Sequence, residues 1–144
     1  MNTDPIVVEN IIDAPVSQVW NAITNKDEMK QWYFDIAEFE LKKGFRFMFY
    51  GGDENKQYAH FCEIKEVIPE KKLSYTWSYE NVPVETLVTF ELSQEGPGKT
   101  KVKLTHSGVE NFPADMPEYA KENFIGGWNH IIGKALPGYF EKNK

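Results

Sequence analysis

The sequence predicts an α+β protein in which a curved antiparallel sheet wraps around a long C-terminal helix. Residues 35–107 carry strand patterns joined by hairpin-length connections, which favour an antiparallel sheet. One amphipathic helix, over residues 118–136, is left to cover the apolar face of that sheet. The order of elements is therefore β-α-α, six further strands and a final helix, within a single domain over residues 1–144.

The first three elements are short. Residues 6–12 are rich in β-branched side chains and predict a strand. Pro15 suits the first turn of a helix, in which apolar residues recur at helical spacing up to Ile23. Asn25 ends that helix and is expected to cap a second one, because Asp27 and Glu28 favour a helix N-terminus. This second short helix is expected to end with Met29, Trp32 and Tyr33.

Six strands are predicted next, over residues 36–41, 45–50, 58–68, 73–79, 84–92 and 99–106. The clearest alternation is in 73–79, where Leu73, Tyr75, Trp77 and Tyr79 share one face. Glycine and proline place turns at residues 51–55, 69–72 and 94–98. In the last strand His106 lies on the apolar face, and three lysines lie on the solvated face. Because strongly twisted strands curl, this sheet is expected to be concave.

The C-terminal helix has an apolar side formed by Ala120, Phe124, Trp128, Ile131, Ile132 and Ala135. Pro137 and Gly138 are expected to kink or end it. Two adjacent glycines in its interior, Gly126 and Gly127, each cost about 1 kcal/mol relative to alanine. Close packing of the helix against the sheet is the favoured explanation for them. The alternative is local softness, which would make this helix a gate.

Composition limits the classes of partner. The formal net charge is −6 and Arg46 is the only arginine, so neither a nucleic-acid surface nor an anionic membrane surface is predicted. Cys62 is the only cysteine, which excludes an intramolecular disulfide and a cysteine-based zinc site. The N-terminus lacks the pattern of a signal peptide, and no apolar run approaches the roughly 20 residues that span a bilayer. A cytoplasmic location is expected.

A single helix rarely fills the concavity of a broad, curved sheet, so an apolar cavity is predicted beneath it. Aromatic residues make up 15% of the chain, and such rigid rings can line a hollow without collapsing into it. Tyrosine hydroxyls and His106, near the expected mouth, would orient a polar end of the ligand. The predicted ligand-binding residues are Trp32, Phe47, Phe49, Tyr75, Trp77, Phe90, His106, Phe124 and Trp128.

No catalytic residue, metal site or cofactor is predicted. His60, His106 and His130 show no ligand-like i, i+4 spacing, and no carboxylate is placed to complete a metal site. The chain has no Gly-x-Ser-x-Gly nucleophile elbow and no phosphate-binding glycine loop. If the protein were an enzyme, only His60 and His106 could supply an ionisable group inside the cavity, and His106 would be the candidate for proton transfer.

Several motifs in this order resemble the helix-grip superfamily of START-like and birch-pollen-allergen-like domains, also called SRPBCC. The closest likeness is to the C-terminal domain family of the activator of the heat-shock-protein-90 ATPase. The motifs are Ala14-Pro15, Val19-Trp20, Trp32-Tyr33, Lys43-Gly44-Phe45-Arg46, Glu66-Val67-Ile68-Pro69, Leu73-Ser74-Tyr75-Thr76-Trp77 and Gly127-Trp128. The resemblance implies a helix-grip fold with a deep apolar pocket under the last helix. It covers nearly the whole chain, but not the separate N-terminal domain of the eukaryotic activator.

Three functional hypotheses follow. The leading one is a soluble protein that holds an apolar small molecule or lipid between the sheet and the C-terminal helix. The second is an interaction protein for a chaperone or another partner, which would bind through an outer surface. The third is an enzyme of the cyclase or hydratase type found elsewhere in the superfamily.

Overall fold

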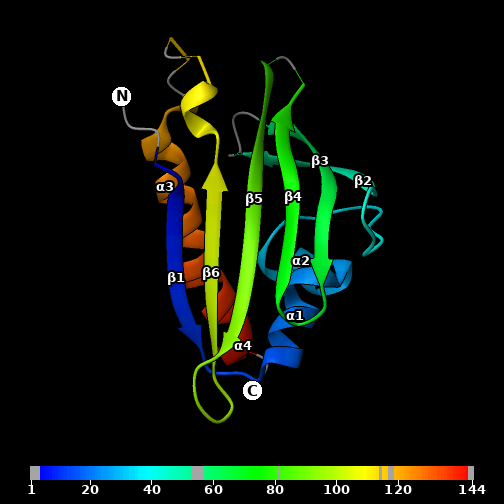
Figure 1. Ribbon diagram of the computed structural model, residues 1–144, viewed down its shortest axis with the longest axis vertical. Coiled ribbons are helices and arrows are strands. Elements are labelled where there is room, and N and C mark those ends of the chain that lie inside the picture. Colours follow the sequence, from blue (N-terminus) through cyan, green and yellow to red (C-terminus); the bar gives the residue numbers. More distant parts are fainter. Residues whose placement is uncertain (1–3, 53–56, 81, 114, 117–118, 143–144) are drawn as a thin grey trace.

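A computed structural model describes residues 4–52, 57–80, 82–113, 115–116 and 119–142. Within them the chain forms one six-stranded antiparallel sheet in the order β1-β6-β5-β4-β3-β2 (Figure 1). Its strands are β1 (Ile6–Ile12), β2 (Arg46–Gly52), β3 (Gln57–Ile68), β4 (Lys72–Tyr79), β5 (Val82–Gln94) and β6 (Thr100–Ser107). The predicted α+β class and the curved sheet with a long C-terminal helix are confirmed.

Two short helices, α1 (Val16–Thr24) and α2 (Lys26–Trp32), follow β1. As predicted, Asn25 caps α2, and its side-chain oxygen accepts hydrogen bonds from the backbone N–H groups of Asp27 and Glu28. A 3-10 turn (Val109–Asn111) follows β6. The chain ends in a continuous helical segment made of α3 (Lys121–His130), a π-helical turn (Ile131–Ala135) and α4 (Leu136–Lys142).

All the helices lie on one side of the sheet. The C-terminal helical segment runs behind β1, β6 and β5, and α1 and α2 lie behind the lower part of β3 and β4 (Figure 1). The sheet turns strongly towards β2, which crosses behind β3. Part of this curvature comes from a bulge in β3 between Ile64 and Glu66. Beside it, the backbone N–H of Glu63 donates to the side-chain oxygen of Thr76, 2.8 Å away.

The prediction of a strand over residues 36–41 is wrong. The chain is irregular there, and β2 begins only at Arg46. In the described part of the chain β2 pairs with β3 alone and forms an edge of the sheet, so residues 36–41 add no further strand to it. Ile36 is nevertheless buried, and its side chain accounts for the apolar pattern. Gly51 and Gly52, predicted to lie in a turn, belong to β2, and residues 53–55 lie outside the described part.

The C-terminal helix is longer than predicted. It does not end at Pro137 but continues to Lys142. Proline cannot donate the helical hydrogen bond to residue i−4, and its ring clashes with that carbonyl. The π-helical turn at Ile131–Ala135 precedes it and ends the α3 register, so Pro137 falls in the first turn of α4, where no such bond is required.

The explanation of Gly126 and Gly127 by close packing is also wrong. Both glycines are exposed, and a Cβ atom added to either would meet no atom within 4 Å. The helix instead packs through Phe124, Trp128, Ile132 and Leu136, which are buried at intervals of four residues. The glycines therefore lower the helical propensity of α3 without allowing a closer approach to the sheet.

Candidate functional site

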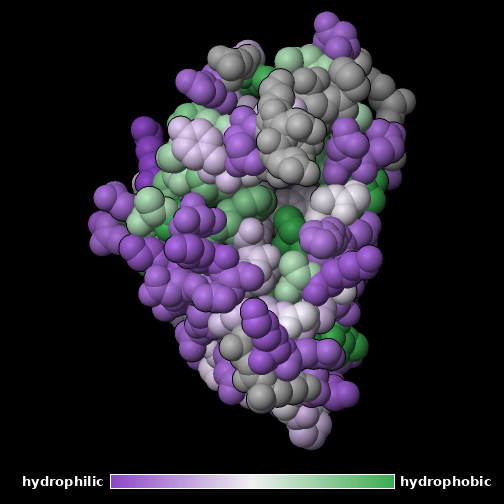
Figure 2. Space-filling view, turned by 180° about the vertical axis from the view of Figure 1, so that it is seen from behind, coloured by the Kyte–Doolittle hydropathy of each residue, from purple (hydrophilic) through white to green (hydrophobic). Residues whose placement is uncertain are grey.

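A pocket of about 240 Å³ lies between α3 and the strands β2, β3 and β4. We call it the sheet–helix pocket. Aromatic side chains form most of its border, with polar groups from His60, Asn123 and two tyrosines. Its border consists of Phe34, Gly51, Tyr58, His60, Trp77, Tyr79, Asn123, Phe124, Gly127, Trp128 and Ile131. In the view from behind the sheet, apolar side chains lie in a hollow in the upper half of the molecule (Figure 2).

The space under the helix is smaller than the predicted deep cavity because two rings that follow α2 fill much of it. Tyr33 stacks on Trp128 at a centroid distance of 6.4 Å, and its hydroxyl lies 2.6 Å from that of Tyr75. Phe34 stacks on Phe49 at 4.4 Å. Neither ring was among the predicted ligand-binding residues. Both come from the irregular segment after α2, where no periodic pattern shows which way a side chain points.

Three of the nine predicted ligand-binding residues, Trp77, Phe124 and Trp128, border the sheet–helix pocket. The others pack away from it. Trp32 is buried between the first two helices, where its indole N–H donates to the carbonyl oxygen of Ala22, 2.9 Å away. The buried side chains of Phe47, Phe49, Tyr75 and Phe90 belong to the continuous core. Their role in ligand binding remains a prediction that their positions do not favour.

His106 was expected to lie near the mouth of a cavity, and this prediction is wrong. It is fully buried, and its two ring nitrogens are both hydrogen bonded. The indole N–H of Trp128 donates to its Nδ1, 3.0 Å away, so the neutral ring carries its proton on Nε2 and donates it to the hydroxyl of Thr86, 2.7 Å away. Burial lowers the pKa of His106 to about 3. His106 therefore joins the helix to the sheet and cannot contact both ligand and water.

His60 is the histidine that borders the pocket. Its ring stacks on Phe49 at 4.7 Å, with an angle of 9° between the planes, and its Nδ1 lies 2.8 Å from the carbonyl oxygen of Tyr58. Burial lowers the pKa of His60 to about 4, although the carbonyl groups of Tyr58 and Phe49 oppose this shift. At neutral pH the pocket therefore contains an uncharged imidazole.

Two glycines shape the pocket. Gly51 lies beside Phe34 and His60, and a Cβ atom there would come within 2.8 Å of the Phe34 ring. Only glycine lets these two rings approach β2 so closely. Gly127 lies across the pocket on α3, and a Cβ atom added there would meet no atom within 4 Å. A larger side chain at this position would project into open space at the border of the pocket. Glycine therefore leaves this part of the border open.

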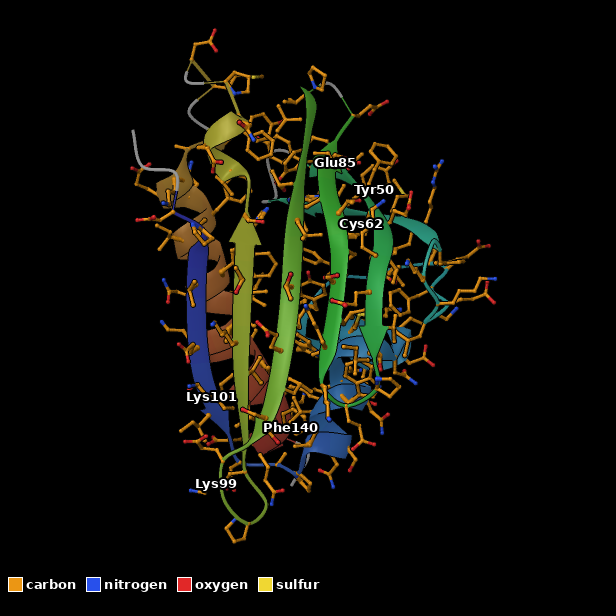
Figure 3. All side chains as sticks on the ribbon, in the orientation of Figure 1. Tyr50, Cys62, Glu85, Lys99, Lys101 and Phe140 are labelled. Carbon is orange, nitrogen blue, oxygen red and sulfur yellow. The ribbon has the colours of Figure 1, made fainter. Side chains whose placement is uncertain are left out.

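A larger depression of about 700 Å³ lies on the opposite side of the sheet. We call it the outer groove. Its border includes outward residues of β2 to β5, among them Arg46, Phe61, Glu63 and Glu85. Figure 3 labels Glu85, Cys62 and Tyr50 near this end of the sheet, and Lys99 and Lys101 at the opposite end. Phe61 is 40% exposed. Charged groups on an open surface suit a protein contact better than a buried apolar ligand.

Neither depression is a metal site: among the residues that the structure describes, no three His, Cys, Asp or Glu side chains are grouped to hold an ion. Cys62 is buried, and burial raises the pKa of its thiol well above the usual range. It behaves as a small apolar residue of the core.

Comparison with known proteins identifies the family. The model of the activator of Hsp90 ATPase homolog 1-like proteins matches residues 13–141. The chain belongs to this family. The matched span contains α1, α2, five of the strands described above and nearly all of the C-terminal helical segment. No significant match was found among curated proteins. Within the described residues no helix is long and apolar enough to cross a bilayer.

Solved structures share the fold of this member of the activator of Hsp90 ATPase homolog 1-like family. MLL2253 from Mesorhizobium loti is 26% identical, with a TM-score of 0.79 over 97% of this chain and 98% of its own. DynU16, a protein of the dynemicin biosynthetic locus, is 24% identical, with a TM-score of 0.79 over 99% of this chain. The present chain spans only 49% of DynU16. CalU16 from Micromonospora echinospora is 23% identical, with a TM-score of 0.73 over 94% of this chain and 73% of its own.

Proposed function

We propose that this protein binds a small aromatic molecule in the sheet–helix pocket. The observation that carries the proposal is the aromatic border of that pocket, closed on one side by rings from β3 and β4 and on the other by Phe124 and Trp128 of α3. Mostly apolar surroundings with a few polar groups are typical of small-molecule sites.

The volume limits the size of the ligand. An apolar protein cavity of about 150 Å³ holds one benzene molecule. At about 240 Å³ the sheet–helix pocket suits a substituted single ring or two fused rings. A long lipid chain does not fit unless the rings of Tyr33 and Phe34 move. Binding would be driven by burial of apolar surface, at about 25 cal/mol per Å².

A pair of matched variants tests the proposal. Gly127 borders the pocket, whereas Gly126 lies on the same helix, is also exposed and does not border it. Gly127→Leu should therefore obstruct the pocket and weaken binding of naphthalene at least tenfold, and Gly126→Leu should leave it unchanged. Affinity is measured by the change in tryptophan fluorescence on titration. The proposal fails if the natural protein binds neither naphthalene nor 2-naphthol, or if both variants bind naphthalene equally well.

A second candidate function is association with an Hsp90-type chaperone, which the description of the family suggests. The outer groove supports it, because this groove combines the exposed ring of Phe61 with charged residues. Glu85 at the groove and Lys101 at the other end of the sheet offer matched charge reversals (Figure 3). Binding to purified Hsp90 should be lost in Glu85→Lys and retained in Lys101→Glu. Absence of binding by the natural protein would end this candidate.

A further inference from the structure

We infer that the sheet–helix pocket selects aromatic molecules that carry a hydroxyl group, through a hydrogen-bond acceptor on His60 and a donor on Tyr79. This inference rests on the proposed function, because it names the ligand class of the same pocket. It depends on which donor and acceptor atoms of His60 and Tyr79 are already hydrogen bonded within the protein.

His60 supplies the acceptor. Nδ1 lies 2.8 Å from the carbonyl oxygen of Tyr58, and the carbonyl group of Phe49 also favours an N–H on the ring. Because a carbonyl oxygen can only accept, we place the proton of the neutral ring on Nδ1, which leaves the lone pair on Nε2. The ring is only 5% exposed, and it is held between the stacked ring of Phe49 and the edge-on ring of Trp77. His60 borders the pocket, and burial keeps its imidazole neutral at pH 7, so Nε2 is the ring atom that can accept from a ligand there.

Tyr79 supplies the donor. Its hydroxyl oxygen accepts a hydrogen bond from the indole N–H of Trp77, 2.9 Å away. Within the described part of the chain this is the only hydrogen bond of the Tyr79 side chain, so its own hydrogen is free to turn to a ligand. Burial raises the pKa of this phenol above its usual range, which keeps it protonated.

The two groups lie side by side. His60 and Tyr79 are directly opposite each other in the β3–β4 register, and their ring centroids are 4.7 Å apart. A phenolic hydroxyl is both a donor and an acceptor, so one such group can donate to His60 and accept from Tyr79. The rest of the ligand then lies among the aromatic rings, where flat molecules make the most contact.

Two other ligand classes fit less well. A hydrocarbon would leave both polar groups without a partner after displacing water, which is unfavourable. A carboxylate would bring a negative charge into a pocket whose described border contains no lysine or arginine, and no positive charge would offset its desolvation. The sheet–helix pocket therefore favours a neutral hydroxyl over either alternative.

The test compares 2-naphthol, naphthalene and 2-naphthoate, which share the same two rings. The natural protein should bind 2-naphthol roughly tenfold more tightly than naphthalene, the effect of about 1.4 kcal/mol of net hydrogen bonding. It should bind 2-naphthoate most weakly. Tyr79→Phe should bring the ratio of the 2-naphthol and naphthalene affinities close to one. Tyr50→Phe, at a tyrosine that is 63% exposed and does not border the pocket, should leave the ratio unchanged.

Using a ratio within each variant removes any general effect of Tyr79→Phe on the fold, such as the loss of the acceptor for the Trp77 indole. Equal affinity for naphthalene and 2-naphthol in the natural protein would overturn the inference while leaving the proposed function intact. A preference that persists in Tyr79→Phe would overturn it as well. If neither compound binds, both the inference and the proposed function fail.

Discussion

At the scale of single residues, the connection between His106 and Trp128 holds the C-terminal helix against the sheet. The Trp128 indole donates to His106, His106 donates to Thr86, and the Thr86 hydroxyl donates to the carbonyl oxygen of Trp77, 2.9 Å away. The chain of bonds thus joins α3 to β6, β5 and β4. Every donor and acceptor in it has a partner, as a buried polar network requires.

The low pKa of His106 predicts that the protein loses stability in acid. In the unfolded chain the imidazole takes up a proton near pH 6.5, whereas the folded protein keeps it neutral down to about pH 3. The stabilising contribution is therefore complete above about pH 6.5 and is lost as the pH falls from there towards 3. His60 acts in the same direction down to about pH 4.

Replacing His106 by glutamine should remove one of these two contributions. Between pH 6 and pH 5 the free energy of unfolding of the natural protein should fall by about 1 kcal/mol more than that of His106→Gln. Urea unfolding at the two pH values measures this difference. If the natural protein and the variant lose the same stability, His106 is not held neutral in the folded state.

The sequence predicted which way His106 points but not its burial. Alternation along 100–106 places it on the inner face, and the structure agrees. His106 is buried because two rings of α3 cover it. Their centroids lie 5.3 Å (Phe124) and 5.8 Å (Trp128) from that of the imidazole. Strand periodicity carries no information about how a distant helix docks. For the same reason, the sequence did not predict that His60, rather than His106, borders the pocket.

At the scale of elements, the strands and caps followed from local chemistry, whereas the irregular parts did not. Asn25 and the alternation of β4 were sufficient to predict α2 and the β4 strand. The irregular segment 36–41 and the π-helical turn depend on tertiary surroundings. An apolar residue such as Ile36 marks burial whether or not a neighbouring strand is present to complete a ladder.

Two glycines should respond in opposite ways to alanine. Gly126→Ala places a methyl group in open space within a helix and should raise the free energy of unfolding by about 1 kcal/mol. Gly51→Ala would bring its methyl group to about 2.8 Å from the Phe34 ring and should lower it by about 1–3 kcal/mol. Urea unfolding of both variants tests this. A destabilised Gly126→Ala would mean that α3 packs more closely than described.

At the scale of the whole molecule, the sequence predicted a curved sheet covered by one helix, and this was sufficient to place a pocket between them. It did not predict the size of that pocket. Tyr33 and Phe34 follow α2 and enter the same space, so a site for a one- or two-ring molecule remains where a deep cavity was expected. Six of the nine residues expected to contact a ligand do not border this pocket, and all six are buried elsewhere in the molecule.

The most direct test of ligand binding in the sheet–helix pocket is an NMR titration with 2-naphthol that follows the indole N–H signals of the four tryptophans. Trp77 and Trp128 border the pocket, whereas Trp20 and Trp32 do not. We expect the signals of Trp77 and Trp128 to shift and saturate together, with those of Trp20 and Trp32 nearly unchanged. Shifts confined to Trp20 and Trp32, or no shift in any of the four, would contradict a ligand site between α3 and the sheet.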